Sequence, residues 1–355
     1  MMSTLRQLSR LSLWCLWLLV SCRDPEPSGT STIPPPQAPQ NTFTNPLLNA
    51  GPDPWVIRHD GWYYYTHTTG NSVRLWKTRK MSELAAAEAK TVWQPSAGRA
   101  FSQNVWAPEL HRLDNRWYVY VTAGSGDNAT QRLWVLENTA TDPLQGEWTL
   151  KGQLTTDADN SWAIDASVFD YNGQRYVTWS GWEGRANVQQ NIYIARLGNP
   201  WTVEGSRVRI SSPDFDWERV GSPLVNEAPQ ALQRNGRLFI SYSAPGCWTD
   251  DYSLGLLTLK AGGDPLRAAD WQKSPQPVFT KSPEARAYGP GHNAFFQSPD
   301  GKEDWFIYHA NPQPGQGCAD FRSPRMQRLT WTADGMPQFG QPVPVLQPVQ
   351  KPSGE

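Results

Sequence analysis

Residues 53–65 read Asp-Pro-Trp-Val-Ile-Arg-His-Asp-Gly-Trp-Tyr-Tyr-Tyr. An ionisable residue leads an apolar run, His-Asp-Gly follows, and a second, aromatic run ends the segment. Asp-Gly between two such runs is a strong signal for a β-hairpin with a tight turn. The segment therefore predicts two antiparallel strands joined at residues 59–61.

The same pattern returns four more times along the chain. The leading residues of the five segments are Asp53, Glu109, Asp165, Glu227 and His292. Successive leaders lie 56, 56, 62 and 65 positions apart, which is long enough for one four-stranded sheet per repeat. Two independent hairpin domains would leave many sheet edges exposed, and closure into a ring removes most of them. The sequence therefore predicts an all-β chain folded as a five-bladed β-propeller.

The first strand of each propeller blade lines the central channel, so the five leaders should lie around one axis. Four of them are carboxyl groups, and burying such a set is costly unless the groups are paired, hydrogen-bonded or bound to metal. Two opposed carboxyls can hydrolyse a glycosidic bond, one protonating the leaving oxygen and the other activating water. A third carboxylate nearby raises the pKa of the acid by repulsion. Spacing alone does not assign these roles among the four.

The composition narrows the class of partner. Thirty-two basic and 33 acidic residues give a formal charge of −1, so no electrostatic argument favours nucleic acid or an anionic membrane surface. The 19 Trp, 12 Tyr and 11 Phe residues suit a β-rich core, and indole faces also pack well on the C–H faces of sugar rings. A neutral carbohydrate is therefore the expected ligand.

Residues 1–22 carry two arginines, then a mainly apolar run, and end in Leu-Val-Ser-Cys22. This segment resembles a bacterial lipoprotein signal with its lipobox. The alternatives are an ordinary signal peptide or a short anchor helix, although about ten apolar residues are too few to span ~30 Å of hydrocarbon. Lipidation of Cys22 would place an exported chain in the cell envelope, periplasmic or on the outer surface, with the lipid as its only membrane contact. Residues 23–45 are rich in Pro, Ser and Thr, a composition that predicts a linker. The propeller is expected to span residues 46–350.

Cysteine usage predicts one disulfide. If Cys15 is removed with the signal and Cys22 is lipidated, Cys247 and Cys318 remain. Two remaining cysteines in an oxidising compartment usually pair. They have no neighbouring Cys or His set of the kind that zinc requires.

Five short runs, each weak alone, occur in order at blade spacing. They are Gly51-Pro-Asp-Pro-Trp, Trp106-Ala-Pro-Glu, Ile164-Asp-Ala-Ser-Val-Phe, Asn226-Glu-Ala-Pro and Gly291-His-Asn. Through them the chain resembles glycoside hydrolase family 43 over roughly residues 45–345. The resemblance implies an inverting mechanism in which Asp53 is the general base and Glu227 the general acid, while Asp165 orients the acid and raises its pKa.

The resemblance also suggests substrate-binding residues. Trp106 would face the sugar, and Glu109 is a further candidate, although its position is more typical of a residue that fixes the inner strand. His292 would contact the substrate or bind a central calcium largely through waters, an unusual ligand for an ion that prefers oxygen. Arg322 would donate paired hydrogen bonds to sugar hydroxyls or to the acid. For Arg325, a position on the surface fits as well as one in the sugar pocket. No organic cofactor is expected.

Residues 246–255 and 311–331 look like family members that act on α-L-arabinofuranosyl linkages. We therefore expect an exo-acting arabinofuranosidase whose partners are arabinose-containing oligosaccharides or plant cell-wall polysaccharides. A β-xylosidase or endo-arabinanase would use the same carboxylates with differently shaped loops. The Trp-Met-Asn-Asp-Pro-Asn run of related fructosidases does not occur. A carbohydrate-binding propeller without turnover is the non-enzymatic alternative, but it would need no acid–base pair.

Overall fold

The computed structural model describes residues 41–355. The predicted signal, the lipidation at Cys22 and most of the predicted linker lie outside the described residues. The described residues belong to one compact unit. Within the described part of the chain, the helices are all too short or too polar to cross a bilayer.

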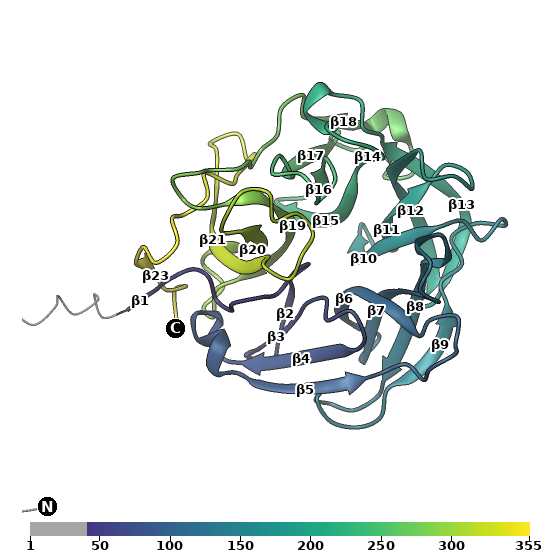
Figure 1. The fold of residues 1–355 in the computed structure, drawn as a ribbon, viewed down its shortest axis with the longest axis horizontal. Coiled ribbons are helices and arrows are strands. Elements are labelled where there is room, and N and C mark those ends of the chain that lie inside the picture. The colour runs from purple at the N-terminus through teal and green to yellow at the C-terminus, as the bar shows by residue number, and fades with distance from the viewer. Residues whose placement is uncertain (1–40) are drawn as a thin grey trace, which may run out of the picture. The chain divides into compact units, whose positions relative to one another are not determined.

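The described chain forms five four-stranded antiparallel blades around a central axis, shown in Figure 1. The repeat seen in the sequence is one blade, and the prediction of an all-β five-bladed propeller is confirmed. Each blade begins with its inner strand and runs outward. The strands are, in blade 1, β2 (Trp55–His59), β3 (Trp62–Thr66), β4 (Val73–Thr78) and β5 (Glu88–Trp93); in blade 2, β6 (Gln103–Leu113), β7 (Arg116–Gly124), β8 (Arg132–Asn138) and β9 (Thr149–Gln153); in blade 3, β10 (Ala163–Tyr171), β11 (Gln174–Trp182), β12 (Gln189–Asn199) and β13 (Thr202–Ser211), with β14 (Leu224–Val225) added parallel to β12; in blade 4, β15 (Glu227–Arg234), β16 (Arg237–Ala244), β17 (Ser253–Leu259) and β18 (Trp271–Lys273); and in blade 5, β19 (Tyr288–Gln297), β20 (Asp304–Asn311), β21 (Ser323–Trp331) and β22 (Pro337–Gln338).

Neighbouring blades pack through the aromatic and branched side chains of their second and third strands. Trp117 on β7 is fully buried and meets Tyr64 on β3 of the preceding blade at 5.1 Å between ring centroids. Burying a side chain of this size stabilises the fold by roughly 1.5–3 kcal/mol. The aromatic runs of the five hairpins therefore serve mainly to pack neighbouring blades against each other.

The first residues of the described chain close the ring onto blade 5. Asn45 both donates to and accepts from the backbone of Met326 on β21, at 3.0 and 2.9 Å. The Gly51 N–H donates to the Arg322 carbonyl at 2.9 Å, and β1 (Thr42–Phe43) pairs with β23 (Val349–Gln350). Inner strand β2 consequently contacts both β6 and β19, and the predicted circle of inner strands is complete.

One residue near the start of each inner strand has a left-handed backbone, a conformation that is uncommon for residues other than glycine. The φ angles lie between 42° and 58° at Asp53, Ala107, Asp165, Ala228 and His292. In blades 2 to 5 this residue sits within a register shift between the first two strands. A β-bulge of this kind re-aims the side chain at that position.

The backbone N–H of each bulge residue donates to a side chain of the preceding blade, so five hydrogen bonds encircle the axis. In four of them the acceptor comes from the same place in the second strand. The pairs are Asp53 with His309 Nδ1, Ala107 with Thr68, Asp165 with Thr122 and His292 with Ser243, at 2.7 to 3.2 Å. In the fifth pair the acceptor for Ala228 is the carboxylate of Asp165, at 3.1 Å.

This register corrects the alignment of the five leaders. Asp53, Asp165 and His292 occupy equivalent bulge positions. Glu109 lies two residues beyond its bulge residue, and Glu227 lies one residue before. The five leaders therefore reach different depths along the axis.

Candidate active site

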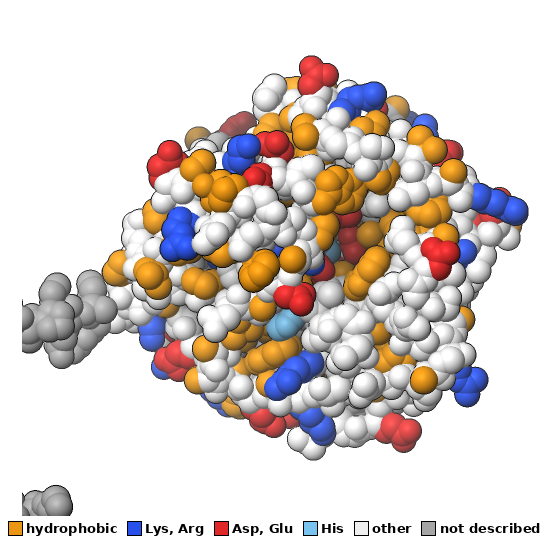
Figure 2. Space-filling model, in the orientation of Figure 1, with side chains coloured by type: hydrophobic (Ala, Val, Ile, Leu, Met, Phe, Trp, Pro, Cys, Tyr) orange, Lys and Arg blue, Asp and Glu red, His pale blue; other side chains and the backbone are white. Residues whose placement is uncertain are grey.

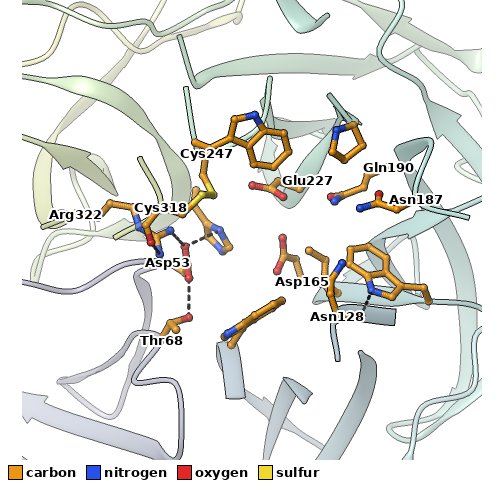
Figure 3. A pocket seen from close by; sticks show the side chains of 16 residues that line it. Asp53, Thr68, Asn128, Asp165, Asn187, Gln190, Glu227, Cys247, Cys318 and Arg322 are labelled. Carbon is orange, nitrogen blue, oxygen red and sulfur yellow. Dashed lines mark hydrogen bonds and ion pairs between the residues drawn. A yellow bond between two sulfur atoms is a disulfide. The ribbon is translucent and has the colours of Figure 1, made fainter. Parts of the chain in front are cut away.

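A cavity of about 300 Å³ lies at the axis and takes lining residues from all five blades. The lining includes six residues singled out from the sequence, namely Asp53, Trp106, Asp165, Glu227, His292 and Arg322. In Figure 2 a hollow with acidic atoms in its depth opens near the centre of the face. Figure 3 shows Asp165 and Glu227 pointing toward each other, with Asp53 and Arg322 to one side.

Asp53 is held as an anion by the residues around it. Arg322 Nη1 lies 2.9 Å from Asp53 Oδ1, and the Thr68 hydroxyl donates to Oδ2 at 2.6 Å. His292 Nδ1 and His309 Nδ1 lie 3.3 and 3.5 Å from Oδ1. Burial by itself would raise the pKa of Asp53, but the Arg322 guanidinium above all, together with the Thr68 hydroxyl, outweighs it and holds the pKa well below its usual range.

The positive charge beside Asp53 comes from Arg322. Burial lowers the pKa of His309 well below its usual value, and burial likewise lowers the pKa of His292. The Nδ1 atom of His309 also accepts the Asp53 N–H, which requires that nitrogen to carry no proton. Both rings are therefore neutral near pH 7, and the guanidinium is the cation of the site.

Glu227 has the opposite electrostatic setting. Burial raises its pKa, and the nearby Asp53 charge raises it further, to about 7. The Tyr252 hydroxyl donates to Glu227 Oε1 at 2.9 Å and offsets part of this rise, as does Arg322. Glu227 can therefore carry a proton at neutral pH while Asp53 remains ionised.

Asp165 and Glu227 titrate as a pair. Burial and repulsion from Glu227 raise the pKa of Asp165 well above its usual range, so the two carboxyls together keep at least one proton near neutral pH. The Ala228 N–H bond to Asp165 Oδ2 favours the charged form of Asp165. Glu227, whose pKa is raised to about 7, can carry that proton.

The structure does not bring Glu109 to the cavity, which corrects its assignment as a substrate-binding residue. Glu109 is 2% exposed and lies deeper in the channel. Its Oε2 atom is 2.9 Å from His111 Nε2, and its Oε1 accepts from Gln230, which in turn accepts from Ser167. The two-residue offset from the bulge explains this depth, and the network ties blades 2, 3 and 4 together.

Arg322 rather than Arg325 lines the cavity. Arg322 precedes β21 and reaches Asp53, while its Nη2 donates to the Cys318 carbonyl at 3.0 Å. Arg325 lies within β21, is fully buried, and donates to the carbonyl of Arg286 at 2.8 Å, so a surface position for it is wrong. Cys247 and Cys318 form a disulfide that also lines the cavity.

The predicted calcium ion at His292 would have few direct side-chain ligands. Residues 41–355 contain no group of three or more His, Cys, Asp or Glu side chains arranged to hold a metal. The His292 Nδ1 atom faces Asp53, and Glu109 is already bonded to His111 and Gln230. Calcium takes six to eight oxygen ligands, so most of them would have to be waters. A calcium role for His292 stays a prediction, which metal analysis of the purified protein would decide.

Three residues that the sequence reasoning missed contact two of the predicted catalytic carboxyls. Tyr252 contacts Glu227, while Thr68 and His309 contact Asp53. Thr68, just past the end of β3, and His309, in β20, take equivalent places in their blades. A polar residue at the end of an aromatic strand was the available signal, but its meaning depends on the register between blades.

The pH dependence of activity follows from these charges. Because Glu227 has a raised pKa of about 7 and must be protonated, kcat/KM should fall about tenfold per pH unit above that value. Because the pKa of Asp53 is held below its usual value of 3.8, no acidic limb should appear above about pH 4. Initial rates measured from pH 4 to 9 check both limbs. An acidic limb near pH 6 would contradict the charge assignment at Asp53.

An axial cavity that pairs a carboxyl of low pKa with a carboxyl of raised pKa, beside tryptophan, is typical of glycoside hydrolases. The family model for glycosyl hydrolases family 43 matches residues 43–337, and the chain belongs to this family.

Relatives and solved structures extend this assignment. The chain is 41% identical over 317 residues to an extracellular exo-α-(1→5)-L-arabinofuranosidase of Streptomyces avermitilis, with 87% of this chain and 65% of the relative covered. It is 40% identical over 321 residues to α-L-arabinofuranosidase 43 of Humicola insolens, with 86% and 65% covered. The chain thus spans slightly less than two thirds of these two proteins. The crystal structure of an α-L-arabinofuranosidase from Lactobacillus brevis superposes with a TM-score of 0.81 at 35% identity, covering 86% of this chain and 98% of that one.

Proposed function

We propose that this chain is an inverting, exo-acting glycoside hydrolase that releases terminal α-L-arabinofuranosyl residues from arabinose-containing oligosaccharides or polysaccharides. The observation that carries the proposal is that one cavity holds both Glu227, whose pKa is raised to about 7, and Asp53, whose pKa is held well below its usual range. The names of the relatives in Streptomyces avermitilis, Humicola insolens and Lactobacillus brevis support arabinofuranosides as the substrate class.

In the proposed reaction the glycosidic oxygen lies at Glu227 and water lies at Asp53. Asp53 takes a proton from the water as its oxygen bonds to the anomeric carbon, while the bond to the leaving oxygen breaks and that oxygen takes the proton of Glu227. Arg322 keeps Asp53 ionised before the reaction. Asp165 is oriented by the Ala228 N–H, and the repulsion between Asp165 and Glu227 favours a proton on this pair of carboxyls.

The anomeric configuration of the first product tests this mechanism. Because water attacks directly, the arabinose released from an α-L-arabinofuranoside should appear first as the β anomer. Proton NMR during the first minutes of hydrolysis distinguishes it from the α anomer before mutarotation mixes them. A first product of retained configuration would remove Asp53 from the role of base.

A panel of substrates tests the substrate class. The protein should release L-arabinose from an aryl α-L-arabinofuranoside and from linear arabino-oligosaccharides, and it should act poorly on an aryl β-D-xyloside. Internal cleavage of linear arabinan would favour endo action instead. Binding of these sugars without turnover would favour a carbohydrate-binding propeller.

We also propose export and a lipid anchor. The relative in Streptomyces avermitilis is named extracellular, and the Leu-Val-Ser-Cys22 run supports lipidation of Cys22. Mass spectrometry of the N-terminal peptide from a bacterial host should show a diacylglyceryl adduct on Cys22, and Cys22→Ala should release the protein from the membrane fraction. An unmodified Cys22 in the mature protein would contradict the anchor.

A further inference from the structure

Exposed large apolar side chains are few on residues 41–355, and most belong to the loops around the cavity. They are Val188, Val220, Trp248, Phe321 and Leu346. Single exposed apolar residues are ordinary, but grouped ones mark binding surfaces. Val188 follows the lining residue Asn187 and Phe321 precedes the lining residue Arg322, whereas Trp248 lines the cavity itself. Only Leu346 stands apart from the loops of the cavity.

Contacts between the loops join four of these residues into one surface. The Leu224 N–H bonds to the Val188 carbonyl at 3.4 Å, so residue 188 lies beside the start of β14. Gly221, next to Val220, lies against Trp248, because a Cβ built there would be 2.9 Å from the indole Nε1. Beyond Trp248, the Cys247–Cys318 disulfide leads to the loop that carries Phe321. We call Val188, Val220, Trp248 and Phe321 the apolar rim.

Trp248 packs against backbone on one face of its ring, and the other face can contact a ligand. The indole lies on the backbone of Gly246, where a Cβ would come within 2.3 Å of the ring atoms. The residue is nevertheless 42% exposed. A flat aromatic surface held against backbone on one side and open on the other suits stacking on a sugar ring.

The position of Glu227 in the cavity determines which part of a substrate reaches this rim. The oxygen that Glu227 protonates is shared with the next unit of the substrate, so that unit begins at blade 4. Glu109, His111 and Gln230 are buried, bonded to one another and outside the lining of the cavity, so the next unit is not expected to extend toward them. It must extend toward the mouth, where blade 4 presents Trp248. Figure 2 shows apolar side chains flanking the mouth of this hollow.

We propose that the apolar rim binds the leaving-group sugar of an arabino-oligosaccharide, with Trp248 as the stacking platform. The inference rests on the proposed function and adds residues that select the unit following the scissile bond. The rim then distinguishes oligosaccharides from arabinosides with small leaving groups, which reach the carboxylates without touching it.

The test compares two substrates in the full-length protein, linear α-1,5-linked arabinotriose and α-L-arabinofuranosyl azide, whose leaving group is too small to reach the rim. Trp248→Ala should lower kcat/KM for arabinotriose about tenfold, mainly through KM. It should leave kcat/KM for the azide within twofold. Leu346→Ala removes a matched exposed apolar side chain far from the lining residues, and it should change neither value.

A second variant moves the indole without removing it. Gly246→Ala places a methyl group where the ring now lies and should reproduce the selective loss on arabinotriose. Equal losses on both substrates in Trp248→Ala, or no loss on either, would overturn the inference. If the unaltered protein turns over neither arabinoside, the proposed function itself fails, and that result is distinct from a failure of the rim alone.

Discussion

Glu227→Gln should lower kcat for an arabino-oligosaccharide by about 10³-fold, because general acid catalysis contributes roughly 10²–10⁴. The loss should shrink to within about tenfold for a 2,4-dinitrophenyl arabinofuranoside, whose leaving group departs without a proton. Glutamine preserves the shape of the side chain and its bond with Tyr252. Steady-state kinetics on the two substrates measures the difference.

The leaving-group dependence is what identifies the acid. Glu109→Gln is a matched control, because Glu109 is also a buried carboxyl but does not line the cavity. Any effect of that change should be the same for both leaving groups. The Glu227 variant should also lose the fall in activity above pH 7, since that limb belongs to its proton. An equal loss on the two substrates would show that Glu227 only shapes the cavity.

Asp53→Ala should lower kcat by about 10⁴-fold for every arabinofuranoside. The size of this loss should not depend on the leaving group. The water that Asp53 activates attacks in all of these reactions, so a better leaving group gives no relief. The change also leaves the Arg322 guanidinium without its carboxylate partner. Rates on the same pair of substrates therefore separate the base from the acid.

Added azide provides the decisive measurement for the base. Azide needs no base and fits the space that the side chain vacates, so it should restore part of the activity on the dinitrophenyl substrate. The product should be β-L-arabinofuranosyl azide, because the new bond forms opposite to the one that breaks. An α-configured azide would require a second inversion and would contradict direct attack.

The fold was predictable because its signal is local and repeated. Each hairpin encodes two adjacent strands, as in residues 53–65, and five copies at blade spacing leave ring closure as the natural arrangement. The bulges were not predictable in the same way. A single extra residue in the inner strand makes Ala107 and Ala228 the equivalents of Asp53, and nothing in a run such as Trp106-Ala-Pro-Glu marks which residue is extra.

The candidate site was predictable to the extent that its residues lie on inner strands. Asp53, Asp165, Glu227 and His292 begin such strands and meet at the cavity. Tyr252 reaches the site from the loop before β17, and its role depends on how loops pack between blades. The choice between Arg322 and Arg325 likewise depended on where β21 begins, since Arg325 within the strand points into the blade packing.

The closure of the ring by residues 45–51 has a consequence for biosynthesis. Asp53 lies at the start of blade 1, whereas Arg322, whose guanidinium keeps Asp53 charged, immediately precedes β21 of blade 5, and the Gly51 N–H bonds to the Arg322 carbonyl. A nascent chain therefore has no competent centre until its final blade has emerged and docked against its beginning. Enzymatic turnover therefore requires the complete ring. A partly folded or truncated chain should be inactive.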